Sequence, residues 1–216
     1  MKNDPSKETI ETWNRLAALY HERFMDLSLY DHSYDFFLDQ LPEGKTSVLE
    51  VGCGPGNITR YCLKKRPELS WLATDAAPDM LEIALRENPS AGVRMLDARD
   101  IAVLDGPFHA MVAGFCLPYL TGNETVSLIR NAGSLLADPG ILYLSFVDGP
   151  PEQSGFQQST AFGRCYFHYH RKNFILDACK KMGFHLLKDF SIPYRKSSGE
   201  TETHDVIIAC RRPALD

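Results

Sequence analysis

The sequence has no long apolar run and no regular cysteine pattern, and these absences exclude several classes of protein. No stretch of about 18 apolar residues occurs among its 216 residues, so no membrane-spanning helix is expected. The first eleven residues are polar and charged, without the apolar centre of a signal peptide. The six cysteines are scattered with no Cys-x-x-Cys pair, which predicts reduced thiols and no metal site. We therefore expect a cytoplasmic protein.

Clustered positive charge is also scarce. The net charge is -5, and no basic stretch stands out beyond Lys64-Lys65-Arg66 and Arg211-Arg212. Nucleic acid that is bound through its phosphates needs a concentrated basic surface. The composition therefore favours a small-molecule partner over nucleic acid or a membrane. The length suggests one domain with at most a small appendage, and we expect a monomer or a homodimer.

A glycine-rich turn stands between a short apolar run and a helical pattern. Val48, Leu49 and Val51 form a short apolar run around Glu50. Gly52, Gly54 and Gly56 follow at alternate positions, and apolar residues then recur at helical spacing from Ile58. Glycines allow the backbone to approach a ligand closely, and the helix that follows directs its free N–H groups towards that ligand. The competing interpretation is a turn with no ligand.

An acidic residue supports the ligand interpretation. Asp75 ends a second apolar run that begins at Leu69, at a distance of roughly 20 residues from the glycines. An acidic side chain at this distance contacts a ribose hydroxyl in nucleoside-binding α/β folds. The alternative role for Asp75 is to cap the next helix.

Three segments together resemble one known family, the class I S-adenosylmethionine-dependent methyltransferases. Glu50 to Gly56 is similar to its motif I, Glu/Asp-x-Gly-x-Gly-x-Gly, while Thr74 to Leu81 and Leu96 to Asp100 are similar to its second and third motifs. The resemblance spans roughly residues 10 to 212. It implies a Rossmann-like α/β fold with a seven-stranded, mostly parallel sheet, a C-terminal antiparallel β-hairpin, helices on both faces and an N-terminal helical lid.

The hydrophobic pattern agrees with this fold, because strand-like and helix-like segments alternate. We expect strands near 47–52, 69–75, 92–96, 108–114 and 140–147, helices near 57–65, 78–87, 122–137 and 171–182, and a terminal hairpin of 184–192 with 203–210. Residues 1–42 form a helical appendage, which the resemblance makes a lid, and residues 43–216 form the α/β domain. The segment after Asp148 is expected to be a long loop as far as Gly163.

The resemblance implies S-adenosylmethionine as cofactor and assigns residues to it. Asp75 would accept hydrogen bonds from the ribose, Asp97 would accept from the adenine amino group, and Glu50 would order the glycine loop. Other interpretations are loop capping for Asp97 and helix packing for Met80. The implied cofactor-binding set is Tyr20, Glu50, Gly52, Cys53, Gly54, Asp75, Ala76, Met80, Asp97, Ala98 and Phe115.

No catalytic residue is evident from the sequence, and His168, His170 and Asp148 are weak candidates for contact with the acceptor. Cys116-Leu117-Pro118-Tyr119 keeps only the last two residues of the Asn/Asp-Pro-Pro-Tyr motif of amino-methyltransferases, which argues against an amide or exocyclic-amine acceptor. We therefore expect direct in-line methyl transfer to a small molecule.

Three alternatives stay open at this stage. They are a protein or nucleic-acid methyltransferase, a non-catalytic S-adenosylmethionine-binding regulator and, more distantly, an NAD-dependent oxidoreductase. The terminal hairpin disfavours the oxidoreductase, as does Asn57, which stands where the dinucleotide fingerprint needs a small residue.

Overall fold

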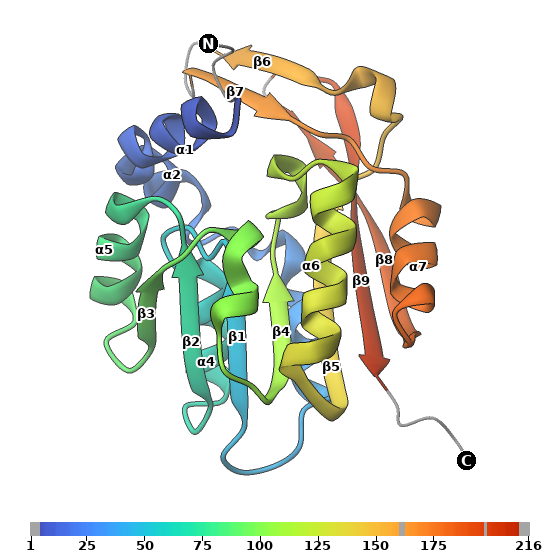
Figure 1. Ribbon diagram of the computed structural model, residues 1–216. Coiled ribbons are helices and arrows are strands. Elements are labelled where there is room, and N and C mark those ends of the chain that lie inside the picture. Colours follow the sequence, from blue (N-terminus) through green and yellow to red (C-terminus); the bar gives the residue numbers. More distant parts are fainter. Residues whose placement is uncertain (1–4, 160–162, 197, 212–216) are drawn as a thin grey trace.

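One twisted sheet of seven strands organises the chain. The computed structural model describes residues 5–159, 163–196 and 198–211. The strand order is β3-β2-β1-β4-β5-β9-β8, with β1 to β5 parallel and β9 antiparallel to both of its neighbours (Figure 1). The predicted fold class is therefore confirmed. The strands are β1 Ser47–Val51, β2 Ser70–Asp75, β3 Gly92–Met95, β4 Phe108–Ala113, β5 Leu136–Val147, β8 Phe184–Arg195 and β9 Thr201–Arg211.

Helices cover both faces of this sheet, and shorter 3-10 turns lie between them. The α-helices are α1 Pro5–Arg15, α2 Ala17–Phe24, α3 Asp31–Asp39, α4 Asn57–Lys65, α5 Pro78–Glu87, α6 Gly122–Leu135 and α7 Lys172–Lys181. The 3-10 helices are η1 Ser28–Tyr30, η2 Ala98–Val103, η3 Leu117–Tyr119 and η4 Pro151–Gln153. Among the described residues, no helix has the length and apolar character that crossing a bilayer requires.

Side-chain alternation along the strands produces two hydrophobic cores, one on each face of the sheet. On β1, Val48 belongs to the core that also contains Phe37 of α3 and Cys62 of α4. The next residue, Leu49, points to the other face and belongs to the core that contains Ile129 of α6. Burial of one such aliphatic side chain stabilises the fold by about 1.5–3 kcal/mol, so these alternating residues fix which face each helix covers.

The N-terminal helices occupy two different places. Tyr34 and Phe37 place α3 in the core against Tyr143 of β5. In contrast, α1 and α2 lie beyond the carboxyl ends of the parallel strands, near α5 (Figure 1). The division of the chain at residue 42 stays a prediction, and the structure shows that α1 and α2 are the part placed over the strand ends.

The segment from 149 to 163 differs from the expected loop. It contains η4 and strand β6 Gly155–Ser159, which pairs antiparallel with β7 Gly163–Phe167 to form a separate two-stranded sheet. Helix α1 supports this ribbon, because Thr12 Oγ1 donates to the Arg164 carbonyl at 2.8 Å and Tyr166 N donates to Thr9 Oγ1 at 2.9 Å. No local pattern predicts this support, since more than 150 residues separate the partners.

The boundary between α6 and β5 also differs from the expected one. Helix α6 ends at Leu135 and β5 begins at Leu136, whereas the pattern predicted a helix to 137 and a strand from 140.

Candidate functional site

The glycine loop joins β1 to α4 in a backbone conformation that glycine favours. Gly52, Gly54 and Gly56 have φ values of +69°, +54° and +82°. A Cβ on Gly56 would lie 2.5 Å from Asn88 Nδ2, so that position is closed by packing. A Cβ on Gly54 would instead approach only Met80 Sδ and Tyr20 Cε1, each at 4.0 Å. Gly54 therefore lies beside open space, as a loop that cradles a ligand requires.

Asp75 connects the end of β2 to this loop. Its Oδ2 accepts from Gly54 N at 2.8 Å and its Oδ1 accepts from Ala77 N at 2.9 Å. Burial raises the pKa of the carboxyl, and hydrogen bonds from the backbone of Ala77, Gly54 and Ala76 partly offset this effect. Because a carboxylate offers about four lone-pair sites, each oxygen can accept one further hydrogen bond from a ligand.

Asp97 follows β3 and forms a bidentate contact with an arginine. Arg99 Nη1 lies 2.9 Å from Asp97 Oδ1 and 2.8 Å from Oδ2, and Arg99 N also donates to Oδ1 at 2.9 Å. Arg99 Nε donates in turn to Glu124 Oε1 at 2.7 Å. Asp97 therefore does cap the η2 loop, as the alternative interpretation proposed, while its side chain still reaches the cavity wall.

Glu50 is buried on β1 beneath the glycine loop. Its Oε2 accepts from Thr59 Oγ1 at 2.5 Å and from Trp71 Nε1 at 2.9 Å. Desolvation raises the pKa of this carboxyl to about 7, although both hydrogen bonds oppose the shift. The Glu50 side chain thus links α4, the helix that follows the glycine loop, to β2. Near neutral pH its carboxyl group can be either protonated or charged.

Phe115 is the one described non-glycine residue with a positive φ, +51°. Its backbone N donates to Ser145 Oγ at 2.9 Å, which holds this conformation at the end of β4. Strained residues of this kind occur at ligand-binding positions when the surrounding structure fixes them.

Two cavities open at the carboxyl ends of the strands and share a common wall. The first has about 840 Å³ of empty space and the second about 1340 Å³, both including space open to solvent. Seven of the described residues line both cavities: Trp13, Tyr20, Gly52, Gly54, Gly114, Phe115 and Tyr119. The shared wall means that ligands in the two cavities would meet at the glycine loop and Phe115.

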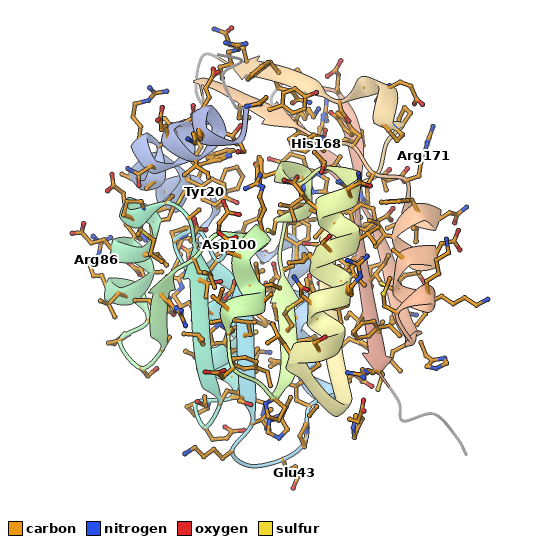
Figure 2. The ribbon with its side chains drawn as sticks, viewed as in Figure 1. Tyr20, Glu43, Arg86, Asp100, His168 and Arg171 are labelled. Atoms are coloured by element: carbon orange, nitrogen blue, oxygen red, sulfur yellow. The ribbon has the colours of Figure 1, made fainter. Side chains whose placement is uncertain are left out.

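All predicted cofactor-binding residues lie on these walls. The first cavity is lined by Asp75, Ala76, Met80, Asp97 and Ala98, the second by Glu50 and Cys53, and both by Tyr20, Gly52, Gly54 and Phe115. Figure 2 shows Tyr20 between the N-terminal helices and the sheet. Burial raises the pKa of its phenol to about 12, with a smaller contribution from Asp75, so this residue is neutral. That these residues bind a cofactor stays a prediction.

The three predicted catalytic candidates lie elsewhere. His170 is buried, and its Nε2 lies 3.0 Å and 3.1 Å from the carbonyls of Leu117 and Leu120, to which it donates. Asp148 Oδ1 accepts from Lys172 N at 2.8 Å and so caps α7. His168 stacks on His170 and lines neither cavity among the described residues. That any of the three side chains contacts the acceptor stays a prediction; in this structure His170 holds the η3 segment and Asp148 holds the start of α7.

Sequence reasoning missed the residues that the terminal hairpin brings to the second cavity. Tyr194 of β8 and Glu202 and His204 of β9 line it, together with Tyr30 of η1. It also missed Arg99 and Trp13 on the walls of the first cavity. Arg99 lies within the third motif, Leu96 to Asp100, whereas no local motif marks the hairpin residues, Tyr30 or Trp13, which contacts between distant segments bring to the cavities.

Comparisons with known proteins agree with this geometry. Residues 48–140 match the family described as methyltransferase domain. The chain is 27% identical over 133 residues to the putative methyltransferase 235L of Invertebrate iridescent virus 6, a match that covers 59% of this chain and 48% of the relative. It is 28% identical over 151 residues to malonyl-[acyl-carrier protein] O-methyltransferase of Paenibacillus sp. (strain JDR-2), with 62% and 55% covered. The chain spans about half the length of these curated relatives.

The fold also matches solved structures. Magnesium protoporphyrin IX methyltransferase (ChlM) from Synechocystis PCC 6803, with bound SAM, superimposes with a TM-score of 0.70 at 15% identity. The match covers 96% of this chain and 97% of that one. At this identity the likeness establishes the arrangement of the sheet and helices.

Proposed function

Because the chain belongs to the class I S-adenosylmethionine-dependent methyltransferases, we propose that it transfers a methyl group to a small-molecule acceptor. One observation carries this proposal. A cavity lined by Asp75 and Asp97 adjoins a second, larger cavity at Gly52, Gly54 and Phe115. This is the arrangement that a cofactor and an acceptor need in order to meet end to end.

The residues of the first cavity fit the cofactor. The open side of Gly54 admits backbone contact, and the free lone pairs of Asp75 suit the two ribose hydroxyls. Met80 and Ala98 offer apolar surface to an adenine ring. When bound, S-adenosylmethionine supplies a methyl group on a positively charged sulfur, and this sulfur is a good leaving group because it departs as a neutral thioether. Glu50, on the wall of the second cavity, suits the positive charge of the methionine part.

The chain's own contribution is positioning and exclusion of water. Helices α1 and α2 cover the strand ends, and Trp13 and Tyr20 line both cavities. Holding two reactants in line converts a bimolecular step into an effectively unimolecular one, which lowers the barrier by about 7–11 kcal/mol when the geometry is optimal.

The lining of the second cavity restricts the acceptor. Its described residues are mostly aromatic or small and polar and include no lysine or arginine, while Glu50 and Glu202 are acidic. An anionic acceptor would need a cationic partner there. The malonyl-carrier relative is named for an acidic acceptor, and we propose that this chain instead takes a neutral small molecule.

Binding of the cofactor is the first test. We expect S-adenosylhomocysteine at 100 times its Kd to stabilise the protein by about 2.7 kcal/mol in thermal unfolding, and NAD to have no effect. Asp75→Ala removes charge-assisted hydrogen bonds worth about 1.5–3 kcal/mol each and should weaken binding at least tenfold in calorimetry. Asp105→Ala, an exposed aspartate outside both cavities, is the matched control. Stabilisation by NAD alone would refute the proposal.

A further inference from the structure

A chain of three hydrogen-bonded side chains lies on the wall of the second cavity. The hydroxyl of Tyr30 lies 2.5 Å from His204 Nδ1, and His204 Nε2 lies 2.9 Å from Glu202 Oε1. Tyr30 and His204 are both buried, at 6% exposure each, yet all three residues line the cavity. The tyrosine comes from η1 and the other two from β9, so the contact joins segments 174 residues apart.

The charges around the chain fix where its protons lie. Lys196 forms an ion pair with Glu202 Oε2. Although burial opposes it, hydrogen bonds from His204 and Lys196 lower the pKa of Glu202, so this group is a carboxylate. A carboxylate can only accept, so His204 Nε2 carries a hydrogen, and in the neutral ring Nδ1 is then the acceptor. The Tyr30 hydroxyl therefore donates to Nδ1.

Aromatic rings hold the imidazole in place. His204 stacks on Tyr194 of β8 with ring centroids 4.6 Å apart, and the edge contact with Phe115 has centroids 4.9 Å apart. The titratable or charged groups that face His204 are thus Tyr30 and Tyr194, with Glu202 on its own strand and Lys196 behind that glutamate. Phe115 also lies on the wall shared with the first cavity, which puts this chain beside the point where the two ligands would meet.

We propose that Tyr30, His204 and Glu202 form a proton relay that serves a neutral phenolic hydroxyl acceptor. The inference rests on the proposed methyl transfer and names the acceptor class. Tyr30 is the catalytic residue that receives the acceptor's proton, His204 takes the proton of Tyr30, and Glu202 is a positioning residue that fixes the imidazole.

The relay balances in atoms and charge. The acceptor oxygen forms its bond to the methyl carbon while the bond from that carbon to sulfur breaks, with both electrons remaining on sulfur. The acceptor's proton passes to the Tyr30 oxygen as the Tyr30 proton passes to His204 Nδ1. The positive charge lost at sulfur appears on the imidazolium, where the Glu202 carboxylate stabilises it.

The surroundings favour a phenol over other acceptors. A carboxylate acceptor is already ionised and needs no base, and the described cavity wall has no lysine or arginine to hold it. A phenol at neutral pH keeps its proton and therefore benefits from a base. Its flat ring fits a wall that includes Phe24, Phe167 and Tyr194.

A purely structural role is the alternative, since buried polar groups normally pair with one another. The two roles differ in how the effect of a substitution depends on the acceptor. Tyr30→Phe keeps the ring and removes the hydroxyl. We expect it to lower kcat for phenol by about 10²–10⁴-fold, the usual contribution of a general base, with little change in KM.

The decisive comparison uses para-nitrophenol at mildly alkaline pH, where this acceptor has already lost its proton, and it is made at saturating acceptor because a wall without lysine or arginine should bind the anion weakly. Tyr30→Phe and the wild type should then have similar kcat values, because no base is needed. Tyr61→Phe, which removes a hydroxyl bonded to Asp35 away from both cavities, is the matched control. An equal loss of kcat for both acceptors would show a structural role and overturn the relay.

A measurement without turnover tests the same arrangement. In nitrogen NMR of histidine-labelled protein, His204 should show hydrogen on Nε2 and an acceptor at Nδ1. Phenol added to the S-adenosylhomocysteine complex should shift the Nδ1 signal in the wild type, and not in Tyr30→Phe. Glu202→Gln should change the His204 tautomer signal, whereas Glu43→Gln, at an exposed loop on the opposite end of the sheet, should not (Figure 2).

The outcomes separate the two proposals. If S-adenosylhomocysteine fails to bind the wild type, the proposed function fails. If it binds but neutral phenols do not, or if amines alone are methylated, the relay and its acceptor class are wrong while the methyltransferase function stands.

Discussion

The two cavities are built in different ways. Apart from the residues that α1 and α2 contribute, the first is lined by loops that follow successive strands, and its carboxylates bond to nearby backbone, as Asp75 does to Ala77 and Asp97 does to Arg99. The second is completed by segments far apart in the chain, as the contact between Tyr30 and His204 shows. A local construction suits a ligand shared across a family, while a wall assembled from distant segments can change with the acceptor.

Gly54 offers the largest expected effect, because it lies on the wall that both cavities share. Gly54→Leu should place a side chain in the open space and so weaken S-adenosylhomocysteine binding by about 10³-fold or more. Separately, a leucine held in the left-handed conformation should lower the unfolding free energy by about 1–2 kcal/mol. Gly44→Leu is the matched control, since Gly44 has φ of +81° and no neighbour within 4 Å. Equal loss of binding in both variants, measured by calorimetry, would show that the effect is conformational and not steric.

Glu50 gives an effect of intermediate size that depends on pH. Burial raises its pKa from 4.5 to about 7, so the folded protein holds this proton over a range in which the unfolded chain has released it. Its contribution therefore makes stability fall as pH rises from 4.5 to about 7, and stay level above that.

Glu50→Gln keeps an oxygen for Thr59 and Trp71 and has no proton to release. As the pH rises through that range, the unfolding free energy of Glu50→Gln should increase by about 3 kcal/mol relative to that of the wild type, at about 1.36 kcal/mol for each pKa unit. Urea unfolding of the ligand-free proteins at several pH values checks this, with Glu43→Gln as an exposed control. Parallel pH curves for Glu50→Gln and the wild type would contradict it.

His170 has the smallest expected effect and marks the limit of the site. His170→Ala leaves the carbonyls of Leu117 and Leu120 without this donor, which should lower the unfolding free energy by about 2 kcal/mol. S-adenosylhomocysteine affinity should be unchanged, because the imidazole lines neither cavity. His185→Ala, an exposed position on β8, should alter neither quantity. Weaker S-adenosylhomocysteine binding with an unchanged unfolding free energy would show that His170 belongs to the ligand site.

Much of the first cavity could be predicted because short-range patterns carry its geometry. Gly52, Gly54 and Asp75 lie where a strand, a turn and a second strand must bring them, and all three reach the cavity wall. The candidates for acceptor contact have no such short-range pattern behind them. His168 and His170 stand out only for their chemistry and proximity in sequence, and the fold uses the His170 imidazole to hold η3 in place.

The sequence by itself determined the alternation of strands and helices, the glycine loop and the acidic residues that follow β2 and β3. These features depend on side-chain period and backbone conformation within short segments. Only the tertiary structure decided that β9 inserts beside β5, that η1 packs against it and that α1 supports the β6–β7 ribbon. Those choices depend on contacts between residues more than 55 positions apart, where complementary surfaces rather than local preference select the partner.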